Sequence, residues 1–185
     1  MKVFYTASFY GKDKYQKHYD LVLAAIEKAG VQVISPEKGN YKRTIPEKVR
    51  AELGDANAVH YEAIRRGILA ADAVIIEASF QDIQIGFEAA LAVASKKPVL
   101  CLSIYEDFSE KINNRYFFGA KYSELNVEGI VGEFVERVKK KRLGERFNMF
   151  LSTSQDQYLE KRAQEDGVTK SEYLRELIDQ DKIKQ

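Results

Sequence analysis

The sequence predicts an α/β fold with helices on both faces of a parallel sheet, because short apolar segments alternate with amphipathic helical segments. A buried strand is expected at 2–6, where Val3, Phe4 and Tyr5 stand in a row. Further strands are expected at 31–34, 73–76 and 98–102. Helices are expected at 14–29, 58–70, from about 85 onward, and at 127–141.

The individual elements follow from spacing and stop signals. The helix at 14–29 has one apolar face and ends before Gly30. Residues 37–56 are polar and predict a long loop with one helical piece at 47–53. Loops are also expected at 77–84 and 105–122. The pattern is typical of an open, doubly wound, flavodoxin-like sheet of about five strands, whose ligands bind at the carboxyl ends of the strands.

Composition narrows the protein class further. The chain has 185 residues, 45% of them hydrophobic, and a net charge of +1, which favours a globular core and no particular charged partner. The single cysteine, Cys101, excludes an internal disulfide and is expected in the core, and the two histidines, His18 and His60, are interpreted as surface or packing residues. We expect a cytoplasmic protein without a membrane span, a metal or an organic cofactor.

The chain is expected to change character after residue 141. A linker is predicted at 142–145, between a domain at 1–141 and a small module at 146–185. The module should contain one strand at 146–151, a helix at 153–165, a stop at Gly167, and a helix at 169–180 opened by a capping box of Thr169 and Glu172. About forty residues cannot bury a core alone, so two chains are expected to share one.

This module, RFNMFLSTSQDQYLEKRAQEDGVTKSEYLRELI, resembles the ribbon-helix-helix family. In that family two strands pair as a ribbon, whose outward side chains enter the major groove of DNA, while the second helix meets phosphate. The resemblance assigns DNA contacts to Arg146, Asn148, Lys170 and Ser171. Phe150 departs from the pattern, because it cannot read a base edge by hydrogen bonding. Residues 146–185 also carry a net charge of −1, so self-association is preferred here over DNA binding.

Three stretches of the larger domain carry a second resemblance. They are Ala71–Ser79, Ile85–Ala92, which includes Gly86-Phe87-Glu88, and Lys97–Leu102. Together with the opening Phe4-Tyr5-Thr6-Ala7-Ser8, they resemble the nucleoside 2-deoxyribosyltransferase family, which includes transferases and related deoxynucleotide N-hydrolases, over residues 2–138.

The resemblance implies that Glu88 attacks the anomeric carbon of a nucleoside sugar. The base leaves, a glycosyl-enzyme ester forms, and water or a second base takes the sugar, as in retaining glycosidases. Gly86 is expected to leave room for the ligand. The alternative is that Glu88 is only an acidic residue favoured by the dipole of a first helical turn.

Other site residues follow from the same resemblance. Asp82 matches the position where the transferases place an aspartate in the base pocket, which favours a nucleoside over a nucleotide and assigns Asp82 a catalytic role as base contact or acid. The loop Ser8, Phe9 and Tyr10 should contact the ligand, with a turn hydroxyl as the alternative for Ser8. Asn113 and Asn114 match a segment that reaches a neighbouring subunit, or are simply turn asparagines.

Two positions depart from the family. Phe4 stands where a tyrosine holds the nucleophile, and strand alternation points the adjacent Tyr5 to the opposite face. Ile64 stands where an aspartate transfers a proton to the base. Three functions therefore remain in view: an enzyme acting on an N-glycosidic bond, a nucleoside-sensing DNA-binding regulator, and a catalytically silent oligomeric nucleoside binder.

Overall fold

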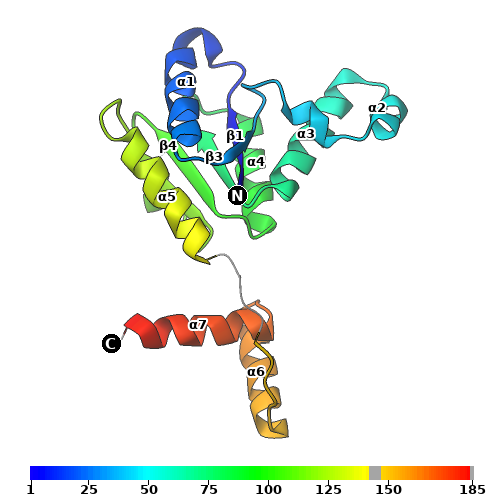
Figure 1. Ribbon diagram of the computed structural model, residues 1–185, viewed down its shortest axis with the longest axis vertical. Coiled ribbons are helices and arrows are strands. Elements are labelled where there is room, and N and C mark those ends of the chain that lie inside the picture. The colour runs from blue at the N-terminus through cyan, green and yellow to red at the C-terminus, as the bar shows by residue number, and fades with distance from the viewer. Residues whose placement is uncertain (142–146, 184–185) are drawn as a thin grey trace. The chain divides into compact units, whose positions relative to one another are not determined.

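The computed structural model describes residues 1–141 and 147–183, which belong to two compact units, Met1–Arg142 and Leu143–Gln185. The predicted linker at 142–145 and the predicted DNA contact Arg146 lie outside the described residues. Figure 1 shows the helices and strands of both units.

The larger unit is built on a five-stranded, all-parallel sheet of order β2-β1-β3-β4-β5, which confirms the flavodoxin-like α/β fold. Its strands are β1 (Lys2–Ala7), β2 (Gln32–Ile34), β3 (Ala73–Glu77), β4 (Val99–Ser103) and β5 (Phe117–Lys121). The order reverses at β1, because β2 pairs on one side of it and β3 on the other. Ligands of such sheets bind beyond the carboxyl ends of the strands at this reversal.

The strand β5 corrects the sequence prediction of an unbroken loop at 105–122. Its sequence, Phe-Phe-Gly-Ala-Lys, lacks the β-branched run typical of a buried strand. Gly119 is required because the preceding loop packs directly on it: an added Cβ would lie 2.5 Å from the backbone nitrogen of Ser109. The glycine that obscures the strand pattern thus permits the close approach of this loop.

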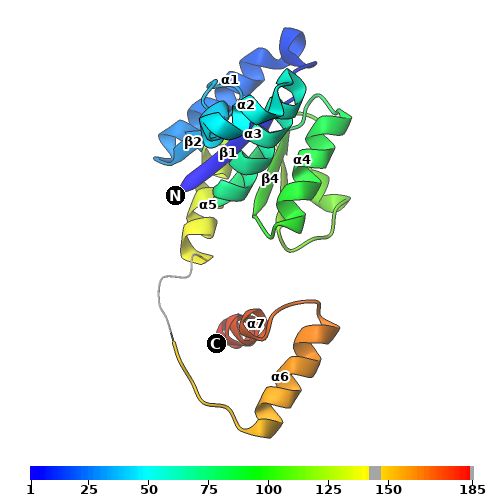
Figure 2. The same ribbon diagram turned by 90° about the vertical axis from the view of Figure 1, so that its right-hand side faces the viewer.

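Helices cover both faces of the sheet. One face carries α1 (Lys12–Lys28) and α5 (Val127–Lys141), and the other carries α3 (Ala56–Ala70) and α4 (Ile83–Ala94) (Figure 1). Figure 2, turned by 90°, shows α3 and α4 in front of the strands. Between β2 and α3 lie the short turn η1 (Tyr41–Thr44) and the predicted helical piece α2 (Glu47–Leu53), while η2 (Phe108–Glu110) precedes β5.

Alternation along β1 divides its side chains between the two cores. Phe4 packs in the core under α3 and α4, whereas Tyr5 lies in the core under α1 and α5. The Tyr5 hydroxyl donates to the backbone carbonyl of Tyr19, at 2.9 Å. The opposite orientation expected for Tyr5 is therefore confirmed, and its hydroxyl is on the far side of the sheet from α4.

The smaller unit contains α6 (Thr153–Glu165) and α7 (Lys170–Ile183), separated by Gly167 in the left-handed region at φ +64°. The predicted capping box is present, since Thr169 and Glu172 exchange side-chain to backbone hydrogen bonds of 3.2 and 2.9 Å. The strand predicted at 146–151 was expected to pair with a second chain, and within the single chain its described residues 147–151 form no ladder. A strand needs a paired neighbour for its backbone groups, and this chain offers none to the segment.

Among the residues that the structure describes, none of the helices combines the length and apolar character needed to cross a membrane.

Candidate functional site

The helix α4 begins at the carboxyl end of β3 and is positioned by its N-cap. The Asp82 carboxylate accepts a hydrogen bond of 2.8 Å from the backbone nitrogen of Ile85, which satisfies one free donor of the first turn. The helix then brings Glu88 round to the face that packs toward the sheet, where its side chain is 1% exposed.

Glu88 is buried without a full set of partners. Its Oε1 accepts a hydrogen bond of 2.9 Å from the side-chain nitrogen of Gln84, one turn earlier, whereas its Oε2 has no partner among the described residues. Burial raises the pKa of the Glu88 carboxyl. Gln84, which donates a hydrogen bond, and the nearby Thr6 side chain, which does not complete one to Oε2, oppose this rise, and the charge of Asp82 adds to it. A buried carboxyl with a free oxygen is an unusual and costly arrangement.

A cavity of about 300 Å³ lies between α3 and α4, and Glu88 is part of its wall. Two aromatic side chains also line it, Tyr61 from α3 and Phe87 from α4, with ring centroids 6.0 Å apart. The other lining residues are Asn57, His60, Ile64, Arg65, Gln84 and Leu91. The volume is at the lower end of the range for small-molecule sites, and aromatic walls with a few polar groups are their usual lining.

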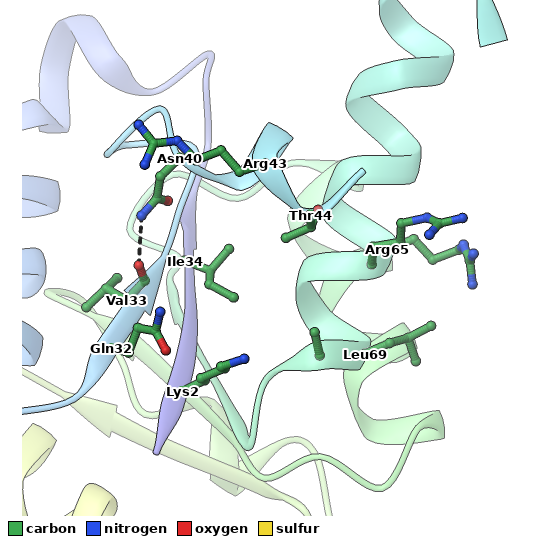
Figure 3. A pocket seen from close by; sticks show the side chains of 11 residues that line it. Lys2, Gln32, Val33, Ile34, Asn40, Arg43, Thr44, Arg65 and Leu69 are labelled. Carbon is green, nitrogen blue, oxygen red and sulfur yellow. Dashed lines mark hydrogen bonds between the residues drawn. The ribbon is translucent and has the colours of Figure 1, made fainter. Parts of the chain in front are cut away.

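A larger hollow of about 780 Å³ lies on the other side of α3, against the edge strand β2 (Figure 3). It is lined by cationic side chains, including Lys2 and Arg43, and by Asn40, whose amide donates to the carbonyl of Val33 at 2.9 Å. None of the predicted site residues lines this hollow. It contains no carboxylate that could act as a nucleophile, so the smaller cavity is the candidate site.

None of the predicted loop residues after β1 lines the cavity, and neither does Asp82. The Ser8 side chain is fully buried and its hydroxyl donates a short hydrogen bond to Asp82, so the first and third strands are joined at their carboxyl ends. Phe9 and Tyr10 project into solvent, with 72% and 75% of their surfaces exposed, and do not line the cavity. The Ser8–Asp82 pair is therefore the structural link between the loop and α4.

Three other predicted contact residues also lie away from the cavity. Gly86 is exposed on α4, and an added Cβ would meet nothing within 4 Å, so no close approach requires this glycine. The side chain of Asn114 accepts from the backbone nitrogen of Tyr116 at 2.9 Å, which is the turn role considered as its alternative. Asn113 is exposed in the same loop.

One of the two departures from the resembled family, Ile64, falls at the site, and the other, Phe4, lies outside the cavity lining. Ile64 lines the cavity, so an apolar surface faces Glu88 where the family has an aspartate. Phe4 is fully buried against α3, and a Cβ added at Gly67 would lie 2.5 Å from its ring. The phenyl ring fills the space that the helical glycine leaves open.

The sequence prediction missed most of the cavity lining, including His60. His60 lies one turn before Ile64 on the same face of α3, its Nδ1 is 2.8 Å from the Tyr41 hydroxyl, and its Nε2 is 3.1 Å from the side-chain nitrogen of Gln84. Burial lowers the pKa of the imidazole, and nearby Lys42 lowers it further. Only the i, i+4 relation to Ile64 pointed to this residue in the sequence.

The predicted DNA contacts of the smaller unit have a different environment. Asn148 and Ser171 are exposed, but the Lys170 ammonium pairs with Asp156 at 2.8 Å and with Glu160 at 3.1 Å. The ammonium group that the resemblance assigns to a DNA phosphate is thus already paired with two carboxylates.

No cluster of three or more potential metal ligands occurs within residues 1–141 and 147–183. Cys101 lies buried in the core under α3 and α4, where it was expected. No protein-family model and no curated protein matches the chain, so both family resemblances rest on the quoted residues alone.

Proposed function

We propose that the larger unit cleaves or transfers at the N-glycosidic bond of a nucleoside-like molecule, with Glu88 as the nucleophile. The observation that carries this proposal is the carboxyl group itself, which is 1% exposed, has one oxygen without a partner and lies in the wall of a cavity. A carboxyl that only capped or stabilised its helix would satisfy its oxygens or reach solvent.

The chemistry divides into two displacements. A Glu88 oxygen bonds to the anomeric carbon while the bond to the base nitrogen breaks, and the base leaves with that electron pair. Water then attacks the glycosyl ester and restores the carboxylate, or a second base takes the sugar and makes the reaction a transfer. The aromatic rings of Tyr61 and Phe87 offer an apolar face to the base.

The test measures free base released from a panel of deoxynucleosides, nucleotides and NAD, whose nicotinamide bond is also N-glycosidic. Glu88→Gln keeps the shape of the side chain and removes the nucleophile, so release should fall on the order of a thousand-fold. The matched control is Glu133→Gln, an exposed glutamate on α5 that should leave the rate unchanged. Release by Glu88→Gln at the rate of the unsubstituted chain would exclude the proposal.

A second candidate is binding without turnover, which is favoured by the absence of acidic or hydroxyl groups at Phe4 and Ile64. In this case the cavity would hold a nucleoside that is not cleaved. Nucleosides would then raise the melting temperature of the chain, because a ligand that binds only the folded state stabilises it, while no free base appears.

We propose further that the smaller unit associates with a second copy of itself. Among the described residues of this unit, the buried core consists of Leu159, Ala163 and Tyr173, with Leu151, Val168 and Leu174 packed against it. The preceding segment exposes Phe147 and Met149, at 84% and 52%. Pairing two such segments in antiparallel fashion would satisfy their backbone groups and place alternate apolar side chains in a shared core.

A further inference from the structure

Four side chains form a continuous hydrogen-bonded chain beside the cavity, running from η1 across α3 to α4. Tyr41 contacts Nδ1 of His60, Nε2 of His60 contacts the side-chain nitrogen of Gln84, and the same nitrogen donates to Glu88. The first and last members are buried, His60 is half-buried and Gln84 is exposed.

The donors and acceptors of this chain fix one protonation pattern. The Gln84 amide nitrogen carries two protons and no acceptor, so it donates one to Glu88 and one to His60. His60 must therefore present a bare Nε2, and its proton lies on Nδ1, which donates to the Tyr41 hydroxyl. The arrangement is complete only with a neutral imidazole and an ionised carboxylate.

Protonation of the imidazole breaks this pattern. A proton on Nε2 would face an N–H of Gln84, and the amide must then turn so that its oxygen accepts from His60. The turned amide also presents its oxygen to Glu88, which can satisfy that oxygen only as a protonated carboxylic acid. Gln84 thus transmits the charge state of one group to the other.

We propose that His60 positions the Glu88 carboxylate through Gln84, so that the neutral imidazole favours the ionised nucleophile and proton uptake by the imidazole favours the carboxylic acid. Simple attraction between charges has the opposite sign, because a cationic imidazole would favour the anion. The charged or titratable groups around His60 are Tyr41 and Lys42 from η1, Tyr61 and Arg65 on its own helix, and Glu88 from α4. Asp82, the N-cap of α4, acts on Glu88.

The consequence for the reaction rests on the proposed function, but the coupling is tested without substrate. The test is a proton NMR titration of the full chain, which has two histidines, so that His18 on α1 serves as an internal control and His60→Gln identifies the His60 signal. We expect Glu88→Gln to raise the pKa of His60 by roughly half a unit or more, because an amide at position 88 tolerates either orientation of Gln84. A decrease or no change would overturn the coupling.

A second pair of variants tests whether the coupling passes through Gln84. In Gln84→Leu the link is removed, and adding Glu88→Gln should then lower the pKa of His60, because only the lost attraction of the carboxylate remains. An increase of equal size in both backgrounds would show that the effect does not pass through Gln84 and would overturn the proposal.

Turnover provides a separate readout. His60→Gln places an amide oxygen where Nε2 accepts, so it should lose less kcat than His60→Leu. It should also shift the loss of activity at acid pH to lower pH, where only Glu88 itself takes up a proton. The matched control is His18→Gln, which should change neither kcat nor the pH profile. An unchanged acid limb in His60→Gln would contradict the positioning role even if Glu88 is confirmed as the nucleophile.

Discussion

At the scale of single residues, the burial of Glu88 sets a pH dependence of stability. Its pKa is raised in the folded chain above the ordinary value of 4.5, so folding favours the protonated form. The unfolded chain releases this proton first, and stability is therefore lost as the pH rises from about 4.5 through the folded pKa.

Glu88→Gln should accordingly raise the melting temperature near neutral pH and have little effect near pH 4, where the carboxyl is already protonated. Thermal unfolding followed by circular dichroism at the two pH values measures the difference. Glu77, also buried, offers a comparison, because Ser79 and Tyr122 donate hydrogen bonds to its carboxylate and oppose the effect of burial on its pKa. A lower melting temperature for Glu88→Gln at neutral pH would mean that the charge is stabilised.

At the scale of elements, two helical glycines should respond in opposite ways to alanine. Gly86 faces open space on α4, so Gly86→Ala should stabilise the chain by about 0.5–1 kcal/mol through lower backbone entropy of the unfolded state. In Gly67→Ala the new methyl would lie 2.5 Å from the Phe4 ring, and overpacking of this kind costs about 1–3 kcal/mol. Urea unfolding compares the two, and equal changes would contradict the packing of Phe4 against α3.

The N-caps of α3 and α4 provide a matched pair for separating stability from function. Asp55 and Asp82 each accept a 2.8 Å hydrogen bond from a backbone nitrogen of the first turn. Alanine at either position should cost about 1 kcal/mol of stability. Only Asp82→Ala also frees the Ser8 hydroxyl, so only this variant should reduce nucleoside turnover or binding. Similar losses of function in both variants would mean that Asp82 acts only as a helix N-cap.

The secondary-structure elements also show how much of the fold can be predicted from the sequence alone. The periodicity of apolar residues predicted four of the strands and the principal helices. The helices were predicted because their apolar faces are regular, and the strands because they are short apolar runs. Periodicity missed β5, where packing of a loop on Gly119 overrides local propensity, and it missed His60, whose partners come from η1 and α4. Contacts between elements distant in the sequence leave no local pattern. The family resemblance singled out Glu88 and Ser8 as site residues. The cavity and the carboxylate oxygen without a partner could be found only in the three-dimensional structure.

At the scale of the whole molecule, the full chain should self-associate through the segment at 147–151. Replacing Phe147 and Met149 together by serine should shift the mass measured by light scattering toward the monomer, because the shared apolar core is lost. Phe150→Ser is the matched control, since this side chain lies on the alternate face of an extended segment and should leave association intact. Equal masses for the double variant and the unsubstituted chain would contradict association through this segment.

The most direct measurement is a peptide map of the full chain quenched with acid while it releases base from a deoxynucleoside. The account predicts a sugar attached through an ester to the peptide that contains Glu88, and no attachment in Glu88→Gln. Steady release of base with the sugar found on a different residue would contradict it.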